Sequence, residues 1–284
     1  MGSLRGASSE GQGRRAGLGA RRALGQHFLK DQSAIDDIVR RALLPRPEVV
    51  VEIGPGKGAL SDRLAVGPHE TILVEKDSRF VALLRERFAA TEGLRVVEGD
   101  AADLDFATLL SAGRRAVVVG NLPYNRAAPI YFNLLAQRHF FARFMLMFQR
   151  EVAERLVASP GSRSYGSPSV VTAVFGAARI VRRLPPGAFA PPPKVHSAVV
   201  EFVPRERGDP AESDSPAEEE RGMASLRALF AYRRKTLANA LSRAVQCSRE
   251  EAVAMIREVG LDPCSRPEQC SPDLLWALVV PPPT

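Results

Sequence analysis

The stretch VVVEIGPGKGA, residues 49–59, decides the fold of this chain. A short β-branched run ends here in a glycine-rich turn, and glycine lets the backbone approach a ligand closely because it has no Cβ to clash. With Ala59 in the last position, the turn satisfies the loose G-x-G-x-x-G/A pattern of dinucleotide-binding proteins. A plain tight connection between a strand and a helix also meets this pattern, so the meaning of the turn depends on the strands that follow.

Further short apolar runs predict a mostly parallel sheet. After Val49 to Ile53, the predicted strands cover residues 71–74, 94–97, 116–119 and 144–148, with longer amphipathic stretches between them. Continuous apolar strands that alternate with helical segments are typical of a parallel sheet covered on both faces. Residues 195–203 predict a late strand at or near an edge of the sheet. We therefore expect a doubly wound, Rossmann-like α/β domain over residues 21–204.

The chain outside this domain divides into three parts. Residues 1–20 are rich in Gly, Ser, Ala and Arg and predict a flexible basic arm; an organelle transit peptide is the alternative, which the many glycines and the missing apolar face disfavour. Residues 205–221 are acidic, contain Pro, Ser and Gly, and predict a linker or long loop. Residues 222–284 show helical periodicity, a capping box at Ser248 and Glu251, and a helix start at Ser271-Pro272. They predict a small all-helical domain.

Length and composition limit the class of protein. A chain of 284 residues that is 45% hydrophobic and 25% charged can form one large and one small domain, each with its own core. Its apolar runs end long before the roughly 20 residues that span a bilayer, so we expect a soluble protein with no membrane contact. The cysteines, Cys247, Cys264 and Cys270, lack Cys-x-x-Cys spacing and nearby histidines. This favours reduced thiols in a cytoplasmic protein over disulfides or a zinc site.

The charge of the chain is unevenly distributed. Residues 206–220 hold seven acids against one arginine, a local charge of −6. Since the whole chain carries +7, the rest of the chain carries +13. A basic surface of this kind suits a polyanion such as nucleic acid. Charge alone fits a solvated basic surface equally well, so a nucleic-acid partner requires support from motifs.

Acidic residues follow the second and third predicted strands and indicate a nucleoside-bearing cofactor. The Glu75 carboxylate can accept both hydroxyl groups of a ribose, and Asp100 is placed to bind an adenine amine. Ligands bind beyond the carboxyl ends of the strands in open α/β sheets, where these residues lie. Glu75, Asp100 and the glycine turn fit either a nicotinamide dinucleotide or S-adenosylmethionine, which shares the adenosine half.

The element that ends the fourth strand distinguishes the two cofactors. Asn121-Leu122-Pro123-Tyr124 follows the apolar residues 116–120 and offers an amide, a rigid proline and an aromatic ring. It contains no acid or base for hydride transfer, whereas an amide and a ring suit methyl transfer to a flat, amino-bearing base. The sequence therefore favours a methyltransferase that uses S-adenosylmethionine.

Six segments resemble the KsgA-type ribosomal RNA adenine dimethyltransferases, in the order expected of that family. They are LGQHFL (24–29), EIGPG (52–56), NLPYN (121–125), FQREVA (148–153), FAPPPKV (189–195) and RRKTL (233–237). The resemblance covers nearly the whole chain after the arm. It implies N6,N6-dimethylation of two adjacent adenines in the 3′-terminal hairpin of small-subunit (16S) ribosomal RNA, during small-subunit maturation. The expected partner is that RNA or the 30S particle, and we expect a monomer without a metal.

The resemblance also implies the site residues. The contacts to S-adenosylmethionine would fall on His27, Leu29, Gly54, Gly56, Glu75, Asp100 and Asn121. The family usually has asparagine where this chain has His27, so that contact must come from the imidazole or the backbone, and His27 is otherwise a packing residue. Tyr124 is either the platform on which the flipped adenine stacks or a packing residue at the strand end. Phe189 is either the opposite wall of the base site or a core residue.

Basic residues near these motifs are candidates for RNA phosphates: Lys194, Arg233, Arg234 and Lys235. Such side chains contribute affinity and register but little sequence discrimination. Two alternative functions remain: an Erm-type methyltransferase that acts on large-subunit ribosomal RNA, and a non-catalytic RNA-binding assembly factor. The segments around Phe189 and Gln26 favour the small-subunit enzyme, and the intact Asn121 to Tyr124 element argues against a loss of catalysis.

Overall fold

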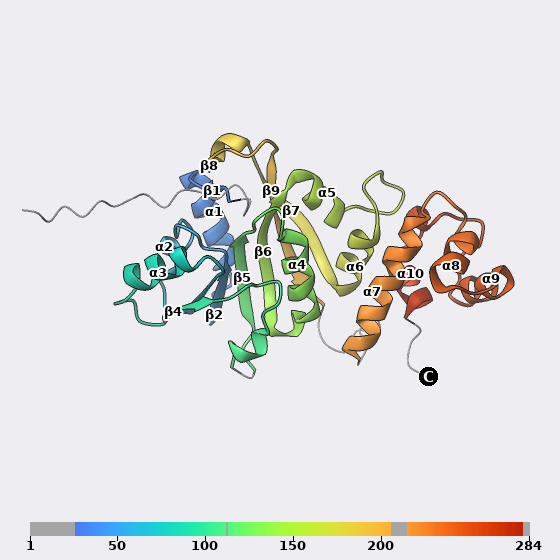
Figure 1. The fold of residues 1–284 in the computed structure, drawn as a ribbon, viewed down its shortest axis with the longest axis horizontal. Coiled ribbons are helices and arrows are strands. Elements are labelled where there is room, and N and C mark those ends of the chain that lie inside the picture. The colour runs from blue at the N-terminus through green and yellow to red at the C-terminus, as the bar shows by residue number, and fades with distance from the viewer. Residues whose placement is uncertain (1–25, 112, 206–214, 281–284) are drawn as a thin grey trace, which may run out of the picture.

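A seven-stranded, mostly parallel sheet forms the centre of the molecule (Figure 1). The computed structural model describes residues 26–111, 113–205 and 215–280. The predicted arm and most of the predicted linker lie outside these ranges. No helix within the described residues is long and apolar enough to cross a membrane.

The strands and helices alternate along the chain as expected for a doubly wound domain, and helices alone follow the last strand. In chain order they are β1 (Phe28–Leu29), α1 (Gln32–Ala42), β2 (Val49–Ile53), α2 (Ser61–Leu64), β3 (Glu70–Glu75), α3 (Ser78–Arg87), β4 (Leu94–Glu98), β5 (Ala116–Asn121), α4 (Ala127–Ala136), β6 (Phe141–Gln149), α5 (Arg150–Leu156), α6 (Ser167–Phe175), β7 (Gly176–Leu184), β8 (Phe189–Ala190), β9 (Ser197–Pro204), α7 (Pro216–Ala231), α8 (Leu237–Val245), α9 (Arg249–Glu258) and α10 (Pro272–Val279).

The strand order of the large sheet is β4-β3-β2-β5-β6-β9-β7. The five strands β2 to β6 pair in parallel, which confirms the strands predicted around the glycine turn, and β9 joins β6 and β7 in antiparallel pairs. The late strand β9 therefore lies next to the edge, as predicted. The edge strand β7 and the two-stranded pair of β1 with β8 were not predicted.

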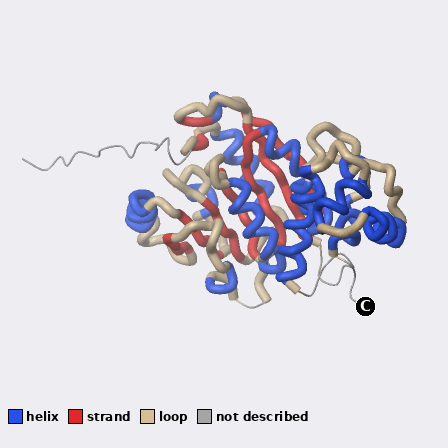
Figure 2. The backbone as a smooth tube through the Cα atoms, turned by 45° about the vertical axis from the view of Figure 1, so that its right-hand side comes forward, coloured by secondary structure: helices blue, strands red, loops and turns tan. Residues whose placement is uncertain are grey.

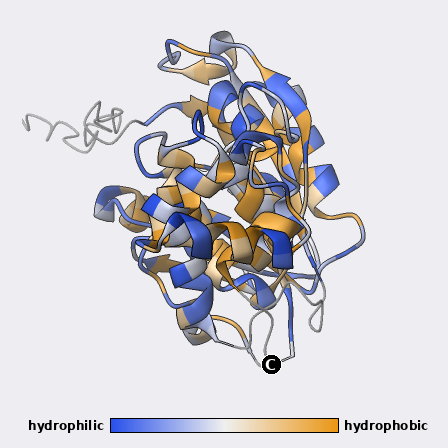
Figure 3. Cartoon of the chain, turned by 90° about the vertical axis from the view of Figure 1, so that its right-hand side faces the viewer, coloured by the Kyte–Doolittle hydropathy of each residue, from blue (hydrophilic) through white to orange (hydrophobic). Residues whose placement is uncertain are grey.

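Helices cover both faces of the sheet, and alternate residues of each strand face opposite layers. Val51 and Val118 face the core that contains α4 and α6, whereas Val50 and Val117 face the core that contains α1. A smaller cluster packs α3 against β3. Figure 2 shows helices, in blue, lying against the strands of the sheet, in red, and in Figure 3 many of the hydrophobic segments lie toward the middle of the molecule.

The C-terminal helices share the core of the sheet domain, so the prediction of a separate small core is wrong. One continuous cluster runs from strand residues such as Phe144 to Leu241 and Trp276 in the helical part. The rings of Phe175 in α6 and Trp276 in α10 pack edge to face, 5.1 Å apart.

Helix α7 begins at Pro216, inside the stretch 205–221 predicted as a linker, because proline is well suited to the first turn of a helix. The predicted capping box at Ser248 is confirmed.

Candidate functional site

A pocket of about 370 Å³ opens at the carboxyl ends of β2, β3 and β5. Its lining includes most residues that the sequence predicts for the site: His27, Gly54, Gly56, Glu75, Asn121, Leu122, Pro123 and Tyr124. This volume is in the range of small-molecule sites, and the position matches the general rule for ligand sites in open α/β sheets. The fold therefore brings together elements that lie far apart in the sequence.

The glycine turn and Glu75 form one wall of the pocket. Gly54 and Gly56 have φ angles of +65° and +54°, which favour glycine. The Gly56 N–H donates to Glu75 Oε2 at 2.9 Å, and the Asp77 N–H donates to Oε1 at 2.8 Å. Burial raises the pKa of Glu75, and these N–H groups oppose the rise. The carboxylate is thus fixed at the pocket wall and keeps lone pairs for hydroxyl donors.

Asp100 forms ion pairs with two basic residues, Lys76 and Arg126, that line the same pocket. Lys76 Nζ lies 2.6 Å and Arg126 Nη2 2.7 Å from Asp100 Oδ2, and the Ala102 N–H donates to Oδ1 at 3.0 Å. Burial raises the pKa of Asp100. The hydrogen bonds from Lys76 and the Ala102 N–H, together with the charge of Arg126, lower it by more than burial raises it, so the net shift is downward. Asp100 is therefore an oriented carboxylate whose Oδ1 can accept a further donor.

Asn121 is oriented by the segment that carries His27. Its side-chain Nδ2 donates to the His27 carbonyl oxygen at 2.7 Å, so the amide oxygen Oδ1 is left to accept a hydrogen bond. His27 Nδ1 lies 2.8 Å from the carbonyl oxygen of Pro191 and must carry the proton in that contact. The imidazole ring lies 5.4 Å from the Tyr124 ring at an angle of 30°. His27 thus lies at the pocket, in contact with Asn121 and Tyr124.

Tyr124 is held at its hydroxyl end. The hydroxyl lies 2.6 Å from Ser197 Oγ in β9, and burial raises the pKa of the phenol. Leu122 is buried, whereas Pro123 and Tyr124 are partly exposed at the pocket. Leu122 therefore anchors the element in the core, and the tyrosine ring is fixed where a flat base could stack on it.

Phe189 and Leu29 lie next to each other in the two-stranded pair of β1 with β8. The two residues pair between β8 and β1, and Phe189 is only 1% exposed within the core that contains α1. In this arrangement Phe189 is a core residue that supports β1, and its contact with a base stays a prediction. Leu29 lines an adjoining cavity of about 210 Å³ that shares Gly54 and Asn121 with the main pocket.

Glu52 is a buried acid that also lines this adjoining cavity. It is 2% exposed, and the Ser61 hydroxyl donates to its Oε2 at 2.6 Å. Burial raises the pKa of Glu52 from 4.5 to about 8; the Ser61 hydrogen bond opposes this, and the charge of Glu75 adds to it. Glu52 therefore holds a proton at neutral pH.

Replacing Glu52 by glutamine is expected to remove a pH dependence of stability. The pKa of Glu52 is higher in the folded chain than in the unfolded chain. The protonated acid therefore gives its full contribution to the stability of the fold below the unfolded pKa, and this contribution is lost as the pH rises toward 8. Relative to the variant, the free energy of unfolding of the wild type should fall by up to about 1.4 kcal/mol per pH unit across this window. Urea unfolding at several pH values measures it, and parallel profiles would contradict the assignment.

The predicted RNA-binding residues do not form one cluster within the described residues. Lys194 is exposed between β8 and β9, whereas Arg233, Arg234 and Lys235 are exposed between α7 and α8, on the far side of the molecule (Figure 1). Arg233 lines a cleft of about 680 Å³ together with Arg155 and Arg163. Arg155 and Arg163, like Lys76 and Arg126, were not predicted because no local motif in the sequence marks them.

Comparisons with known proteins place this chain in one family. A family model described as ribosomal RNA adenine dimethylase matches residues 17–278. The ribosomal RNA small subunit methyltransferase A of Geobacter metallireducens is 39% identical over 92% of this chain and 95% of its own length. Among solved structures, a dimethyladenosine transferase from Plasmodium falciparum is 25% identical, with a TM-score of 0.71 over 89% of this chain and 96% of that one. The 23S rRNA methyltransferase ErmE shares the fold at 23% identity, with a TM-score of 0.64 over 89% of this chain and 98% of its own.

Proposed function

The chain belongs to the ribosomal RNA adenine dimethylase family, and from this we propose that it dimethylates, with S-adenosylmethionine, two adjacent adenines in the 3′-terminal hairpin of small-subunit ribosomal RNA. The observation that carries the proposal is the orientation of Asn121. Its Nδ2 donates to the His27 carbonyl, so its amide oxygen is left to accept a hydrogen bond, and Asn121 lines one pocket together with Glu75 and Tyr124. A hydrogen-bond acceptor, a ribose-binding carboxylate and an aromatic ring in one pocket suit methyl transfer to an adenine amine.

The residues of the pocket fit S-adenosylmethionine, which supplies an electrophilic sulfonium methyl group when bound. At Gly54, a Cβ would lie 3.8 Å from the Asn121 carbonyl oxygen and 3.9 Å from the Pro123 ring, so the glycine keeps this corner of the pocket open. Glu75 would hold the ribose hydroxyls and Asp100 the adenine amine. The backbone around Gly54 and Gly56, with His27 and Leu29, would hold the methionine portion.

The chemistry assigned to the protein is activation of the target amine. The lone pair of an adenine amine is delocalised into the ring, which makes the nitrogen a poor nucleophile. Hydrogen bonds accepted by Asn121 Oδ1 and by a main-chain carbonyl of the Leu122-Pro123 step would favour the tetrahedral nitrogen and free the lone pair. Tyr124 would stack on the extruded base. After transfer the nitrogen is acidic and releases its proton, so the reaction needs no strong base.

The basic remainder of the chain supports ribosomal RNA as the partner. Arg233, Arg234 and Lys235 are exposed, and Arg233 shares a polar cleft with Arg155 and Arg163. Guanidinium groups bind phosphates through paired hydrogen bonds. We propose that these residues, with Lys194, hold the RNA backbone while the base enters the pocket. The activity would take place on the assembling 30S particle in the cytoplasm, with the chain acting as a monomer.

A substrate comparison tests the proposal. The protein is incubated with labelled S-adenosylmethionine and one of four acceptors: under-methylated small subunits, the isolated hairpin, large-subunit RNA or DNA. We expect label in the small-subunit hairpin as dimethyladenosine. Transfer confined to large-subunit RNA would support the Erm-type alternative. RNA binding without any transfer would support the assembly factor and contradict the proposal.

A further inference from the structure

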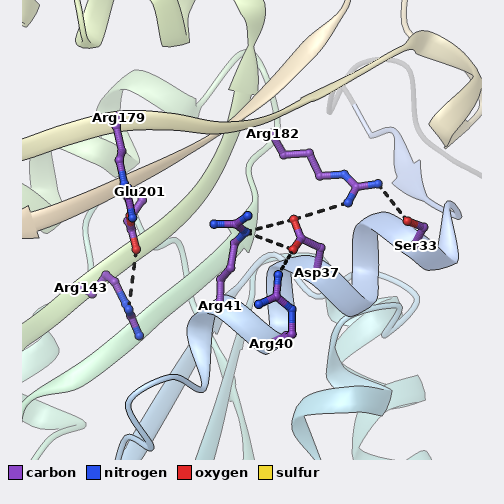
Figure 4. Close-up of polar contacts among 8 residues, drawn as sticks. All are labelled: Ser33, Asp37, Arg40, Arg41, Arg143, Arg179, Arg182 and Glu201. Atoms are coloured by element: carbon purple, nitrogen blue, oxygen red, sulfur yellow. Dashed lines mark hydrogen bonds and ion pairs between the residues drawn. The ribbon is translucent and has the colours of Figure 1, made fainter.

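Five arginines lie together on the sheet face beside α1 (Figure 4). They are Arg40 and Arg41 in α1, Arg143 in β6, and Arg179 and Arg182 in β7, and we call this set the arginine face. It is distinct from the α7–α8 loop, which lies across the molecule (Figure 1). The face begins near the pocket, because α1 follows β1 directly and Arg182 Nη2 donates to Ser33 Oγ at 3.1 Å in the first turn of α1.

Two carboxylates hold these five guanidinium groups. Asp37 pairs with Arg40, with Arg41 at 3.1 Å and with Arg182 at 3.4 Å. Glu201 in β9 pairs with Arg179 at 2.5 Å and with Arg143 at 3.6 Å. The set therefore carries a net charge of +3, since five cations share two anions. The two carboxylates orient its guanidinium groups but do not neutralise their charge.

A bulge in β7 places two of the arginines on this side. The pairing of β7 with β9 shifts register between Ile180 and Arg182. Without the shift, Arg179 and Arg182 would point to opposite faces, because side chains alternate along a strand. With it, Arg179 reaches Glu201 and Arg182 reaches Asp37, both on the α1 side.

A second arginine cluster in this molecule has no excess of positive charge, in contrast to the arginine face. Near β3 and β4, Arg95 pairs with Glu70, and Arg114 pairs with both Glu48 and Glu70. Two cations meet two anions there, and the set is neutral. Exposed ion pairs add little stability, so the strength of the pairs does not explain Arg40 and Arg179, whose side chains are 61% and 72% exposed.

We propose that the arginine face binds phosphates of the ribosomal RNA backbone, as a contact additional to the loop between α7 and α8. This inference rests on the proposed function, which supplies RNA as the partner. Arg179 and Arg40 are the most accessible members, with side chains 72% and 61% exposed. Phosphate oxygens match the fork of donors on a guanidinium group, and such contacts would fix the register of the RNA beside the pocket.

The double variant Arg40→Ala/Arg179→Ala tests the proposal. Both carboxylates keep arginine partners in it, because Asp37 retains Arg41 and Arg182 and Glu201 retains Arg143. Binding to transcribed small-subunit RNA is measured over a series of salt concentrations. We expect affinity to fall roughly tenfold and the slope of log K against log salt to fall by about 1 to 2, one phosphate contact per arginine.

The matched control is Arg95→Ala/Arg114→Ala, which removes the same charge from the neutral cluster. It should leave the salt slope unchanged, and equal slopes in the two double variants would overturn the proposal. If the arginine-face variant binds naked RNA normally but binds whole small subunits poorly, the face contacts a ribosomal protein and the proposal is also wrong. Transfer to under-methylated small subunits by the wild type is measured in parallel, because its absence would contradict the proposed function instead.

Discussion

Replacing Asn121 by alanine is expected to reduce methyl transfer by roughly two to three orders of magnitude, the usual cost of removing one preorganised polar group that acts on the transition state. The amide oxygen of Asn121 is the acceptor that the geometry leaves available, because Nδ2 already donates to the His27 carbonyl. The adenine lone pair would then remain delocalised while the methyl donor is still bound. The effect should appear in the rate of transfer and much less in binding.

Single-turnover transfer to under-methylated small subunits measures this loss, and calorimetry with S-adenosylmethionine measures whether the release of the His27 segment also weakens binding. Tyr124→Phe is the matched control in the same element. It keeps the ring and loses only the hydroxyl contact with Ser197, so its rate should stay within about tenfold of the wild type. Transfer near the wild-type rate in the Asn121 variant would show that the assigned role is wrong.

The second large effect is expected from Glu219→Ala, which should lower the free energy of unfolding by about 3 to 5 kcal/mol. Glu219 in α7 forms a two-point ion pair with Arg138, at 2.8 and 2.6 Å, and both side chains are 8% exposed. The guanidinium group also lies over the Phe175 ring, 4.1 Å from its centre. Removing the carboxylate would leave a buried cation where the C-terminal helices meet the sheet domain.

Urea unfolding measures this destabilisation, with Glu218→Ala as the control. Glu218 lies in the same turn of α7, and its pairing with Arg221 at 3.9 Å is exposed, so its loss should cost less than about 1 kcal/mol. A double variant, Arg138→Met/Glu219→Leu, should recover most of the lost stability because no unpaired charge remains buried. Equal small effects for Glu218 and Glu219 would show that the ion pair does not hold the helices in place.

The sequence predicted the centre of the fold because its signals there are local. Strands β2 to β6 are apolar runs, and the glycine turn after β2 needs a backbone that only glycine adopts easily. The edge strand β7 escaped prediction because three arginines and a bulge interrupt its alternation. The shared core of the C-terminal helices also could not be foreseen, since it depends on contacts such as Phe175 with Trp276, 101 residues apart.

The site was predictable where a strand end marks it. Gly54, Glu75 and Asn121 each follow an apolar run, and all three line the pocket. The contact of Asn121 with the His27 carbonyl spans 94 residues and leaves no local pattern in the sequence. The same holds for Arg126, which reaches Asp100 across 26 residues. Long-range side-chain contacts of this kind need the folded arrangement of the sheet.

Nucleoside analysis of small subunits treated with the protein tests the central claim most directly. Under-methylated subunits and S-adenosylmethionine are incubated with the wild-type chain, and the 3′-terminal hairpin is then isolated and digested. Mass spectrometry should find two methyl groups on the N6 nitrogen of each of two adjacent adenines, and none with the Asn121→Ala variant in the same time. Unmodified adenines in that hairpin, with methyl groups found elsewhere or nowhere, would contradict the account.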